Sequence, residues 1–195
     1  MKLRAFLPFL PVLASLLLAL GGLSGCGTNA VTKATQAHRD QYAALDDDSL
    51  QAYLQRNKYT NYTRTNSGVY IVQLPVAPGT VKGTTAITTG SQVTIQYIGW
   101  VLTVNQSYYN LTTGPTPGKT FDSSYDNRTA CGCATFTVGT GLVPGFSEGL
   151  TYLRQGDHAL LLIPSQQAYG PAGQNGGIYP DSSLLFDVVV QATNP

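Results

Sequence analysis

The chain has 195 residues, of which 43% are hydrophobic and only 11% are charged, and its formal net charge at pH 7 is +1. This balance gives no reason to expect a nucleic acid as a partner, because binding to phosphates requires a surplus of lysine and arginine. Once an N-terminal targeting segment is set aside, about 170 residues remain, which suit one domain with its own core.

The N-terminus has the layout of a secretory signal. Lys2 and Arg4 precede an apolar run over residues 5–20, which is shorter than a comfortable membrane span of about 20 residues. The motif Leu-Ser-Gly-Cys at 23–26 follows, and it resembles the bacterial lipobox, in which the cysteine is acylated and becomes the first mature residue. The alternative is an ordinary signal peptide with a cysteine near its cleavage site.

The lipobox resemblance implies that residues 1–25 are a lipoprotein signal peptide and that Cys26 carries acyl chains such as palmitate. Each buried methylene of such a chain contributes about 0.8 kcal/mol, so several chains hold a protein on a membrane. Gly27 occupies the position where an aspartate implies retention at the inner membrane, so the expected location is the bacterial cell envelope, at its outer membrane. Whether the anchored domain faces the periplasm or the exterior stays open.

The two remaining cysteines, Cys131 and Cys133, are separated by one glycine. An oxidising envelope favours a bonded pair over free thiols. Three interpretations stay open: a local structural disulfide, a redox-active dithiol, or a bond to another chain. We favour the local disulfide, because no thioredoxin-like βαβ pattern surrounds the pair. The spacing of cysteines and histidines fits no zinc site, so we expect no metal and no cofactor.

In chain order, residues 26–60 are expected to form a tether and an N-terminal helical segment. Residues 27–33 are small and polar, which is typical of a tether. A helix is predicted over 34–57, with the aspartates 46–48 as capping and first-turn acids. The apolar face of this helix is expected to consist of Leu45, Leu50, Tyr53 and Leu54.

Residues 61–195 are expected to form the folded domain, because the hydrophobic pattern changes there to period two. Strands are predicted at 69–74, 92–102, 133–138, 159–163 and 184–191. The segment 144–153 is the one helical pattern among them, with Pro144 suited to its first turn. An antiparallel α+β domain whose sheet folds around this short helix is the predicted fold class.

Four motifs add to this pattern: Val-Thr-Ile-Gln-Tyr-Ile-Gly at 93–99, Phe-Asp-Ser-Ser at 121–124, Ala-Tyr-Gly at 168–170 and Leu-Phe-Asp-Val at 185–188. In this order and at these spacings, the segment 69–192 resembles the FKBP-type peptidyl-prolyl cis-trans isomerases. The resemblance implies an antiparallel sheet of five to six strands wrapped around one short helix, with a proline-binding pocket between helix and sheet. It also implies an isomerase (rotamase) that needs no cofactor, binds proline-containing segments of unfolded or exported proteins, and accepts macrolide ligands.

Carried over residue by residue, the resemblance implies a definite pocket. The expected catalytic residues are Tyr97, Phe121, Asp122 and Tyr169. The expected substrate-binding residues are Leu142, Val143, Phe146, Ile178 and Phe186. In this interpretation the Tyr169 hydroxyl donates to a substrate or macrolide carbonyl group.

Some positions depart from the family pattern. Ala134 stands where much of the family has an aromatic residue, and Tyr179 stands where isoleucine or proline is usual. A polar insertion at 103–118 is a further difference. These departures leave an alternative open, namely a non-catalytic chaperone or binding lipoprotein with the same fold. The function that we expect is an isomerase that assists the folding of exported proteins.

Overall fold

The computed structural model describes residues 26–102, 120–127, 129–175 and 177–194. The expected signal peptide at 1–25 and the polar insertion at 103–118 lie outside the described residues, as does the side chain of Cys26. The chain divides into two compact units, at 1–38 and 39–195.

Helix α1 spans Cys26–Arg56, so it begins earlier than the predicted start at residue 34. The segment 27–33, which we expected to be a tether, is helical, because it contains no proline and the helix propagates through it. In the part of the chain that the structure describes, no helix is both long and apolar enough to cross a membrane.

The three aspartates at 46–48 lie in the interior of α1, so the prediction that they cap the helix is wrong. Their positions follow from the earlier start of the helix, which places its first turn well before them. Asp46 and Asp47 instead accept hydrogen bonds from other parts of the folded domain.

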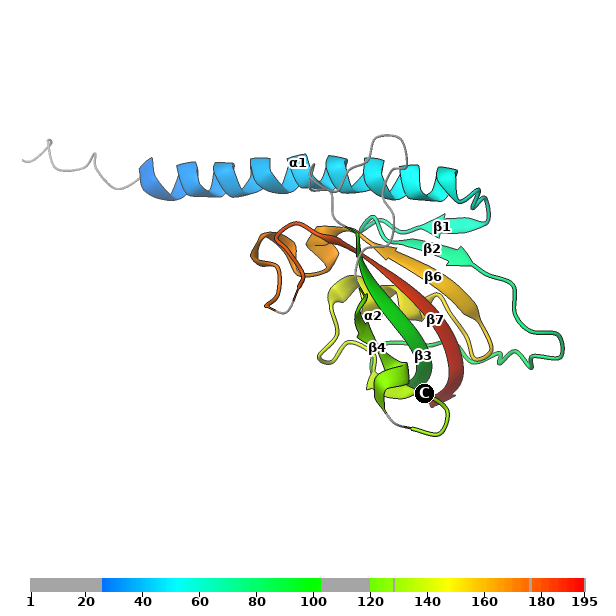
Figure 1. Ribbon diagram of the computed structural model, residues 1–195. Helices are drawn as coiled ribbons and strands as arrows, with labels where there is room; N and C mark the ends of the chain where they lie inside the picture. The colour runs from blue at the N-terminus through cyan, green and yellow to red at the C-terminus, as the bar shows by residue number, and fades with distance from the viewer. Residues whose placement is uncertain (1–25, 103–119, 128, 176, 195) are drawn as a thin grey trace, which may run out of the picture. The chain divides into compact units, whose positions relative to one another are not determined.

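The sheet is antiparallel throughout, with the strand order β1-β2-β6-β7-β3-β4 and with β5 also paired to β3 (Figure 1). The strands are β1 (Tyr62–Arg64), β2 (Tyr70–Gln73), β3 (Gln92–Leu102), β4 (Thr120–Ser123), β5 (Ala134–Thr137), β6 (His158–Ile163) and β7 (Ser183–Asn194). The predicted α+β fold with its antiparallel sheet is confirmed. Within the described residues the sheet has seven strands, because the short strands β1 and β4 add to the five that the sequence pattern predicts.

Helix α2 (Pro144–Thr151) packs on one face of the sheet. Its Phe146 and Leu150 are buried in a core cluster with side chains of β2, β3, β6 and β7. Gly149 allows the close approach, since a Cβ atom there would lie 2.8 Å from Cδ1 of Leu161 on β6. The expected short central helix is therefore present, and its apolar face forms the centre of the domain.

The other face of the sheet is covered by the part of α1 that belongs to the second unit. Leu50, Tyr53 and Leu54 are buried there against alternate side chains of β2 and β6, because successive residues of a strand point to opposite faces. Burial of each such side chain contributes about 1.5–3 kcal/mol. Leu45, which we expected on the same apolar face, is 39% exposed.

The described residues of the domain also form three short 3₁₀ helices: η1 (Ser124–Asn127), η2 (Ser165–Gln167) and η3 (Gly170–Ala172). The first follows β4, and the other two lie in the connection between β6 and β7. Both connections matter for the site. The first adjoins, and the second carries, a polar side chain that lies at the edge of the pocket.

Candidate active site

A pocket of about 140 Å³ opens where α2 meets the sheet. Strands β3, β4, β5 and β7, helix α2 with the segment before it, and the β6–β7 connection all contribute to it. Its lining is Tyr97, Phe121, Asp122, Phe136, Gly141, Leu142, Val143, Phe146, Tyr169 and Phe186. Six of these side chains are Phe or Tyr, and the rings of all but Tyr169 contact one another, so the pocket has an apolar aromatic wall and a small polar edge.

Strand register brings the wall together at Gly99. This residue of β3 lies opposite Asp122 of β4 on one side and opposite Phe186 of β7 on the other. A Cβ atom at Gly99 would lie 2.8 Å from a ring carbon of Phe186 and 3.0 Å from one of Phe121. The missing side chain thus lets these two rings meet edge to face, with centroids 5.6 Å apart.

Phe146 of α2 forms the floor of the pocket. Its ring centroid lies 4.4 Å from that of Phe186 and 6.0 Å from that of Tyr97. The side chain is 3% exposed, so the floor is dry. The helix positions it because Pro144 begins α2 immediately after Leu142 and Val143, which line the pocket beside it.

The polar edge begins with Tyr97 and Asp122. The Tyr97 hydroxyl donates a hydrogen bond of 2.8 Å to Oδ2 of Asp122. Burial raises the pKa of Tyr97 well above its ordinary value, and the hydrogen bond to Asp122 and the charge of that carboxylate add to the shift. Tyr97 is therefore a neutral donor that holds the carboxylate at the edge of the pocket.

Tyr169 completes the polar edge. It lies between η2 and η3, and burial, followed by the nearby charge of Asp122, raises its pKa. Among the described residues, none accepts a hydrogen bond from the Tyr169 hydroxyl. A neutral O–H donor is thus available beside the aromatic wall to a carbonyl oxygen of a bound peptide.

The structure brings together eight of the nine residues that the sequence assigns to catalysis and substrate binding. The exception is Ile178, which is 5% exposed and packs in the core cluster but does not line the pocket. It pairs with Gln174 through a β-bridge in the η3–β7 connection. Ile178 therefore anchors the connection to the core cluster.

Phe136 lines the pocket although the sequence analysis did not assign it to the site. Its ring lies 5.7 Å from that of Tyr97 and 6.4 Å from that of Phe146. Ala134 and Phe136 are two residues apart on β5 and contact the same core cluster, as the strand period requires. Phe136 thus supplies an aromatic ring on the β5 wall, although Ala134 stands where much of the family has one, which removes a main argument for a non-catalytic module.

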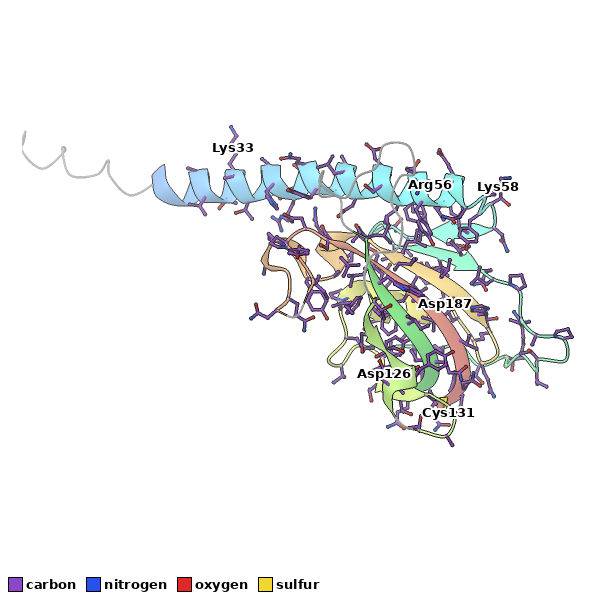
Figure 2. The ribbon with its side chains drawn as sticks, in the orientation of Figure 1. Lys33, Arg56, Lys58, Asp126, Cys131 and Asp187 are labelled. Carbon is purple, nitrogen blue, oxygen red and sulfur yellow. A yellow bond between two sulfur atoms is a disulfide. The ribbon has the colours of Figure 1, made fainter. Side chains whose placement is uncertain are left out.

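Cys131 and Cys133 are joined to each other in the structure, with their Cα atoms 5.2 Å apart, in the loop that precedes β5 (Figure 2). The Gly132 carbonyl between them accepts a hydrogen bond of 2.7 Å from Ser124, and the same hydroxyl accepts one of 2.8 Å from the Tyr97 N–H. This arrangement agrees with the local structural disulfide among the three interpretations. It also ties the loop to the backbone of a pocket residue.

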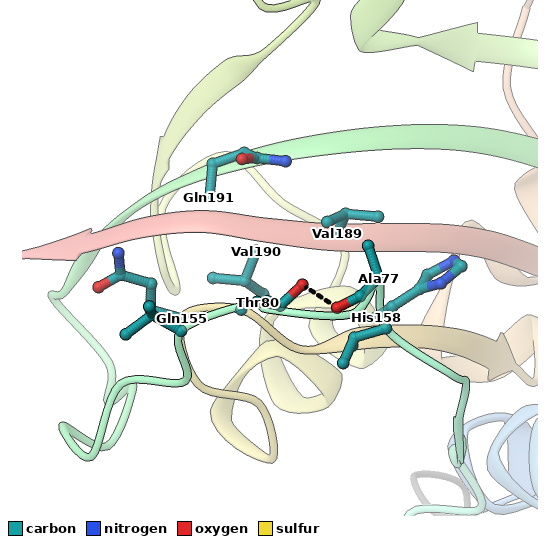
Figure 3. A pocket seen from close by; sticks show the side chains of 10 residues that line it. Ala77, Thr80, Gln155, His158, Val189, Val190 and Gln191 are labelled. Carbon is teal, nitrogen blue, oxygen red and sulfur yellow. Dashed lines mark hydrogen bonds between the residues drawn. The ribbon is translucent and has the colours of Figure 1, made fainter.

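A larger hollow of about 410 Å³ lies elsewhere, between the segment that follows β2 and the strands β6 and β7 (Figure 3). Aliphatic side chains such as Val76, Ala77 and Val189 line this hollow together with the amide side chains of two glutamines. Its described lining includes no phenylalanine, tyrosine or tryptophan. His158 at its border is paired with Asp187 at 2.7 Å. The smaller aromatic pocket is the better match for a proline ring.

A sheet wrapped around a short helix, with an aromatic pocket between them, defines the class of peptide-binding proline isomerases. Residues 83–191, more than half of the chain, match the family described as FKBP-type peptidyl-prolyl cis-trans isomerase. The chain belongs to this family.

Individual relatives agree with this assignment. A peptidyl-prolyl cis-trans isomerase of Schizosaccharomyces pombe is 37% identical over 106 residues, which cover 54% of this chain and 80% of the relative. An FK506-binding protein of Neisseria meningitidis is 33% identical over 100 residues, covering 51% and 76%. The crystal structure of a peptidyl-prolyl cis-trans isomerase from Pseudomonas syringae shares the fold, with a TM-score of 0.56 at 19% identity, covering 83% of this chain and 96% of that one.

Proposed function

We propose that this isomerase acts on Xaa-Pro bonds of exported proteins in a bacterial cell envelope, and that acyl chains on Cys26 anchor it to the outer membrane. The observation that carries the catalytic part is the juxtaposition of an aromatic wall with the Tyr97–Asp122 pair and the Tyr169 hydroxyl. The sequence of the first 26 residues supports the anchor.

The reaction requires rotation about an amide bond against a barrier of about 18–20 kcal/mol, which arises from resonance in the planar amide. The twisted amide has less charge separation than the planar one, so transfer into a dry aromatic pocket favours it over the ground state. Phe146 and Phe186 supply this apolar surface for the proline ring. No bond is broken, so the reaction needs neither a nucleophile nor a metal.

Tyr169 and Asp122 have distinct roles in this proposal. The Tyr169 hydroxyl donates a hydrogen bond to a substrate carbonyl and so holds the peptide on one side of the rotating bond. Asp122, whose carboxylate is oriented by Tyr97, lines the same edge and acts on the rotating bond. Leu142 and Val143, which precede α2 in the chain, contact the peptide, and the Val143 N–H is the expected backbone donor to it.

A peptide assay tests the catalytic proposal. The cis-trans exchange rate of a short Xaa-Pro peptide is measured with the purified full-length chain, with and without an FK506-type macrolide. Uncatalysed exchange takes tens to hundreds of seconds, so acceleration is easily detected. We expect acceleration that the macrolide abolishes; a folded protein that leaves the rate unchanged would contradict the proposal.

Cell fractionation tests the anchor separately. The natural chain should incorporate radioactive palmitate and sediment with outer-membrane vesicles, whereas Cys26→Ser should incorporate none and remain in the soluble fraction. Cys131→Ser serves as the matched control, because it removes a cysteine outside the lipobox and should leave labelling unchanged. Equal labelling of the Cys26→Ser variant would overturn the assignment of the lipid to this residue.

A further inference from the structure

The connection between β6 and β7 positions Tyr169 at the pocket. It leaves the sheet after Ile163 and returns at Ser183, and these strand ends are neighbours because Ile163 pairs with Leu184. Inside the connection, Tyr169 lies between η2 and η3. The placement of the Tyr169 hydroxyl therefore depends on how firmly the two ends of this connection are held.

A single carboxylate of α1 holds both ends. Oδ2 of Asp46 accepts hydrogen bonds from the backbone N–H and the hydroxyl of Ser165, at 2.8 and 2.7 Å. Oδ1 accepts a hydrogen bond of 2.9 Å from the hydroxyl of Ser183. Each carboxylate oxygen is thus assigned to one end of the connection.

All three residues are fully buried: the exposed fractions of Asp46, Ser165 and Ser183 are each 0%. Water does not compete for these hydrogen bonds, and they are correspondingly strong in the low-dielectric interior. The same burial is costly for the carboxylate, because desolvation raises the pKa of Asp46 and outweighs its hydrogen bonds to Ser165 and Ser183. The carboxylate is matched there to three buried donors at the two ends of the connection, so its presence is explained by what it holds in place.

Backbone hydrogen bonds continue from the held ends to Tyr169. The Ala168 N–H donates to the Ser165 carbonyl at 3.0 Å, directly before Tyr169 in the chain. The Asp181 N–H donates to the Gly170 carbonyl at 2.9 Å, directly after it. Tyr169 is therefore enclosed by two short bonded segments, one beginning at Ser165 and the other ending near Ser183.

Asp46 lies outside the part of the chain that matches the isomerase family, which begins at residue 83. The isomerase domain supplies the two serines, and the N-terminal helix supplies the acceptor for both. Asp47, the next residue of α1, binds Tyr70 and Arg64 instead, on β2 and β1. Adjacent carboxylates of one helix therefore contact different parts of the domain, which provides a natural control.

We propose that Asp46 is a positioning residue for the isomerase pocket, which fixes both ends of the 165–183 connection and thereby places the Tyr169 hydroxyl. The proposal rests on the isomerase function and not on the proposed membrane anchor. Without the carboxylate the connection samples positions in which Tyr169 is withdrawn from the pocket. The affinity for any ligand of the pocket then falls in proportion to the fraction of time for which the Tyr169 hydroxyl lies at the pocket.

The test compares Asp46→Ala, Asp46→Asn and Asp47→Asn in the full-length chain, at a temperature where circular dichroism shows all of them folded. Asp46→Ala should reduce kcat/KM for an Xaa-Pro peptide by about three- to tenfold and weaken macrolide binding by the same factor. Asp46→Asn keeps one acceptor oxygen and should fall between the natural chain and Asp46→Ala. Asp47→Asn should lower the melting temperature but leave kcat/KM within about twofold.

Hydrogen exchange separates positioning from a general loss of stability. In Asp46→Ala the amides of Ala168 and Asp181 should exchange faster, while amides in the β6–β7 ladder keep their protection. Faster exchange throughout the domain, or unchanged exchange at both amides with unchanged kcat/KM, overturns the proposal. Should Asp46→Ala not fold, Ser183→Ala tests the same connection from its other end. If the natural chain shows no isomerase activity, the catalytic function is contradicted. The hydrogen-exchange measurement then still tests whether Asp46 holds the two ends of the connection.

Discussion

The Tyr97 hydroxyl on β3 is hydrogen-bonded to Oδ2 of Asp122 on β4 at 2.8 Å, and the other carboxylate oxygen accepts a bond of 2.9 Å from the Ser123 N–H. Both oxygens of Asp122 are therefore oriented before any peptide binds. A side chain held in this way loses little further entropy on binding. The Tyr97–Asp122 part of the polar edge is thus preorganised, whereas the Tyr169 hydroxyl has no hydrogen-bond acceptor among the described residues and stays available to a peptide.

Buried tyrosines give the protein a predictable response to alkaline pH. Burial raises the pKa of Tyr97 well above the ordinary 10.0, and burial, with the neighbouring Tyr59, raises that of Tyr53 to about 12. The folded state therefore keeps phenol protons that the unfolded state releases. The stabilisation is fully present below pH 10 and is lost as pH rises through the folded-state pKa values.

Chemical denaturation at a series of pH values checks this expectation. The free energy of unfolding should decline above about pH 10, and the decline should be shallower in Tyr97→Phe. Tyr125→Phe is the matched control, since it removes a hydroxyl from a side chain that is 53% exposed. Identical pH profiles for the two variants would show that Tyr97 does not contribute as described.

The second prediction concerns the close approach of rings at Gly99. In Gly99→Ala the added methyl would collide with Phe186 and Phe121, at 2.8 and 3.0 Å. Overpacking of this kind costs about 1–3 kcal/mol, so we expect a lower free energy of unfolding together with weaker macrolide binding. Gln92→Ala changes an exposed residue of the same strand and should remain within about 0.5 kcal/mol of the natural chain. A fully stable Gly99→Ala variant with unaltered binding would contradict the described packing.

A third prediction uses two leucines of α1. Leu54 is 2% exposed and packs on the sheet, whereas Leu45 is 39% exposed. Leu54→Ala should therefore reduce the free energy of unfolding by about 2–5 kcal/mol. Leu45→Ala should cost less than about 1 kcal/mol. Equal losses in the two variants would indicate that the helix rotates to bury both side chains.

The sequence permits prediction of the fold class and most of the pocket, because the residues of the pocket lie in motifs with fixed spacing. Phe121, Asp122 and Phe186 are recognisable in this way. Phe136 is harder to assign, because Ala134, two residues earlier, departs from the family pattern. The Phe136 ring lies on the same face of β5 and takes the place of the missing aromatic side chain. Gly99 is a further indication of the pocket in the sequence, since a glycine inside a strand indicates that another group approaches the backbone closely.

The role of Asp46 could not be predicted from the sequence. Three successive aspartates are typical of a helix N-terminus, and hydrogen bonds between residues more than a hundred positions apart leave no local pattern. The start of α1 was predicted too late for a related reason. Residues 27–33 contain no proline that would end a helix, so the helix propagates through them.

The central claim is that the aromatic pocket with Asp122 at its edge catalyses proline isomerisation. The most direct measurement compares Asp122→Ala with Asp126→Ala in the Xaa-Pro peptide assay, since Asp126 is an exposed acid in the following 3₁₀ helix and does not line the pocket. We expect Asp122→Ala to lose at least about tenfold in kcat/KM while Asp126→Ala retains the activity of the natural chain. A folded Asp122→Ala variant with unchanged kcat/KM would contradict the assignment of the pocket.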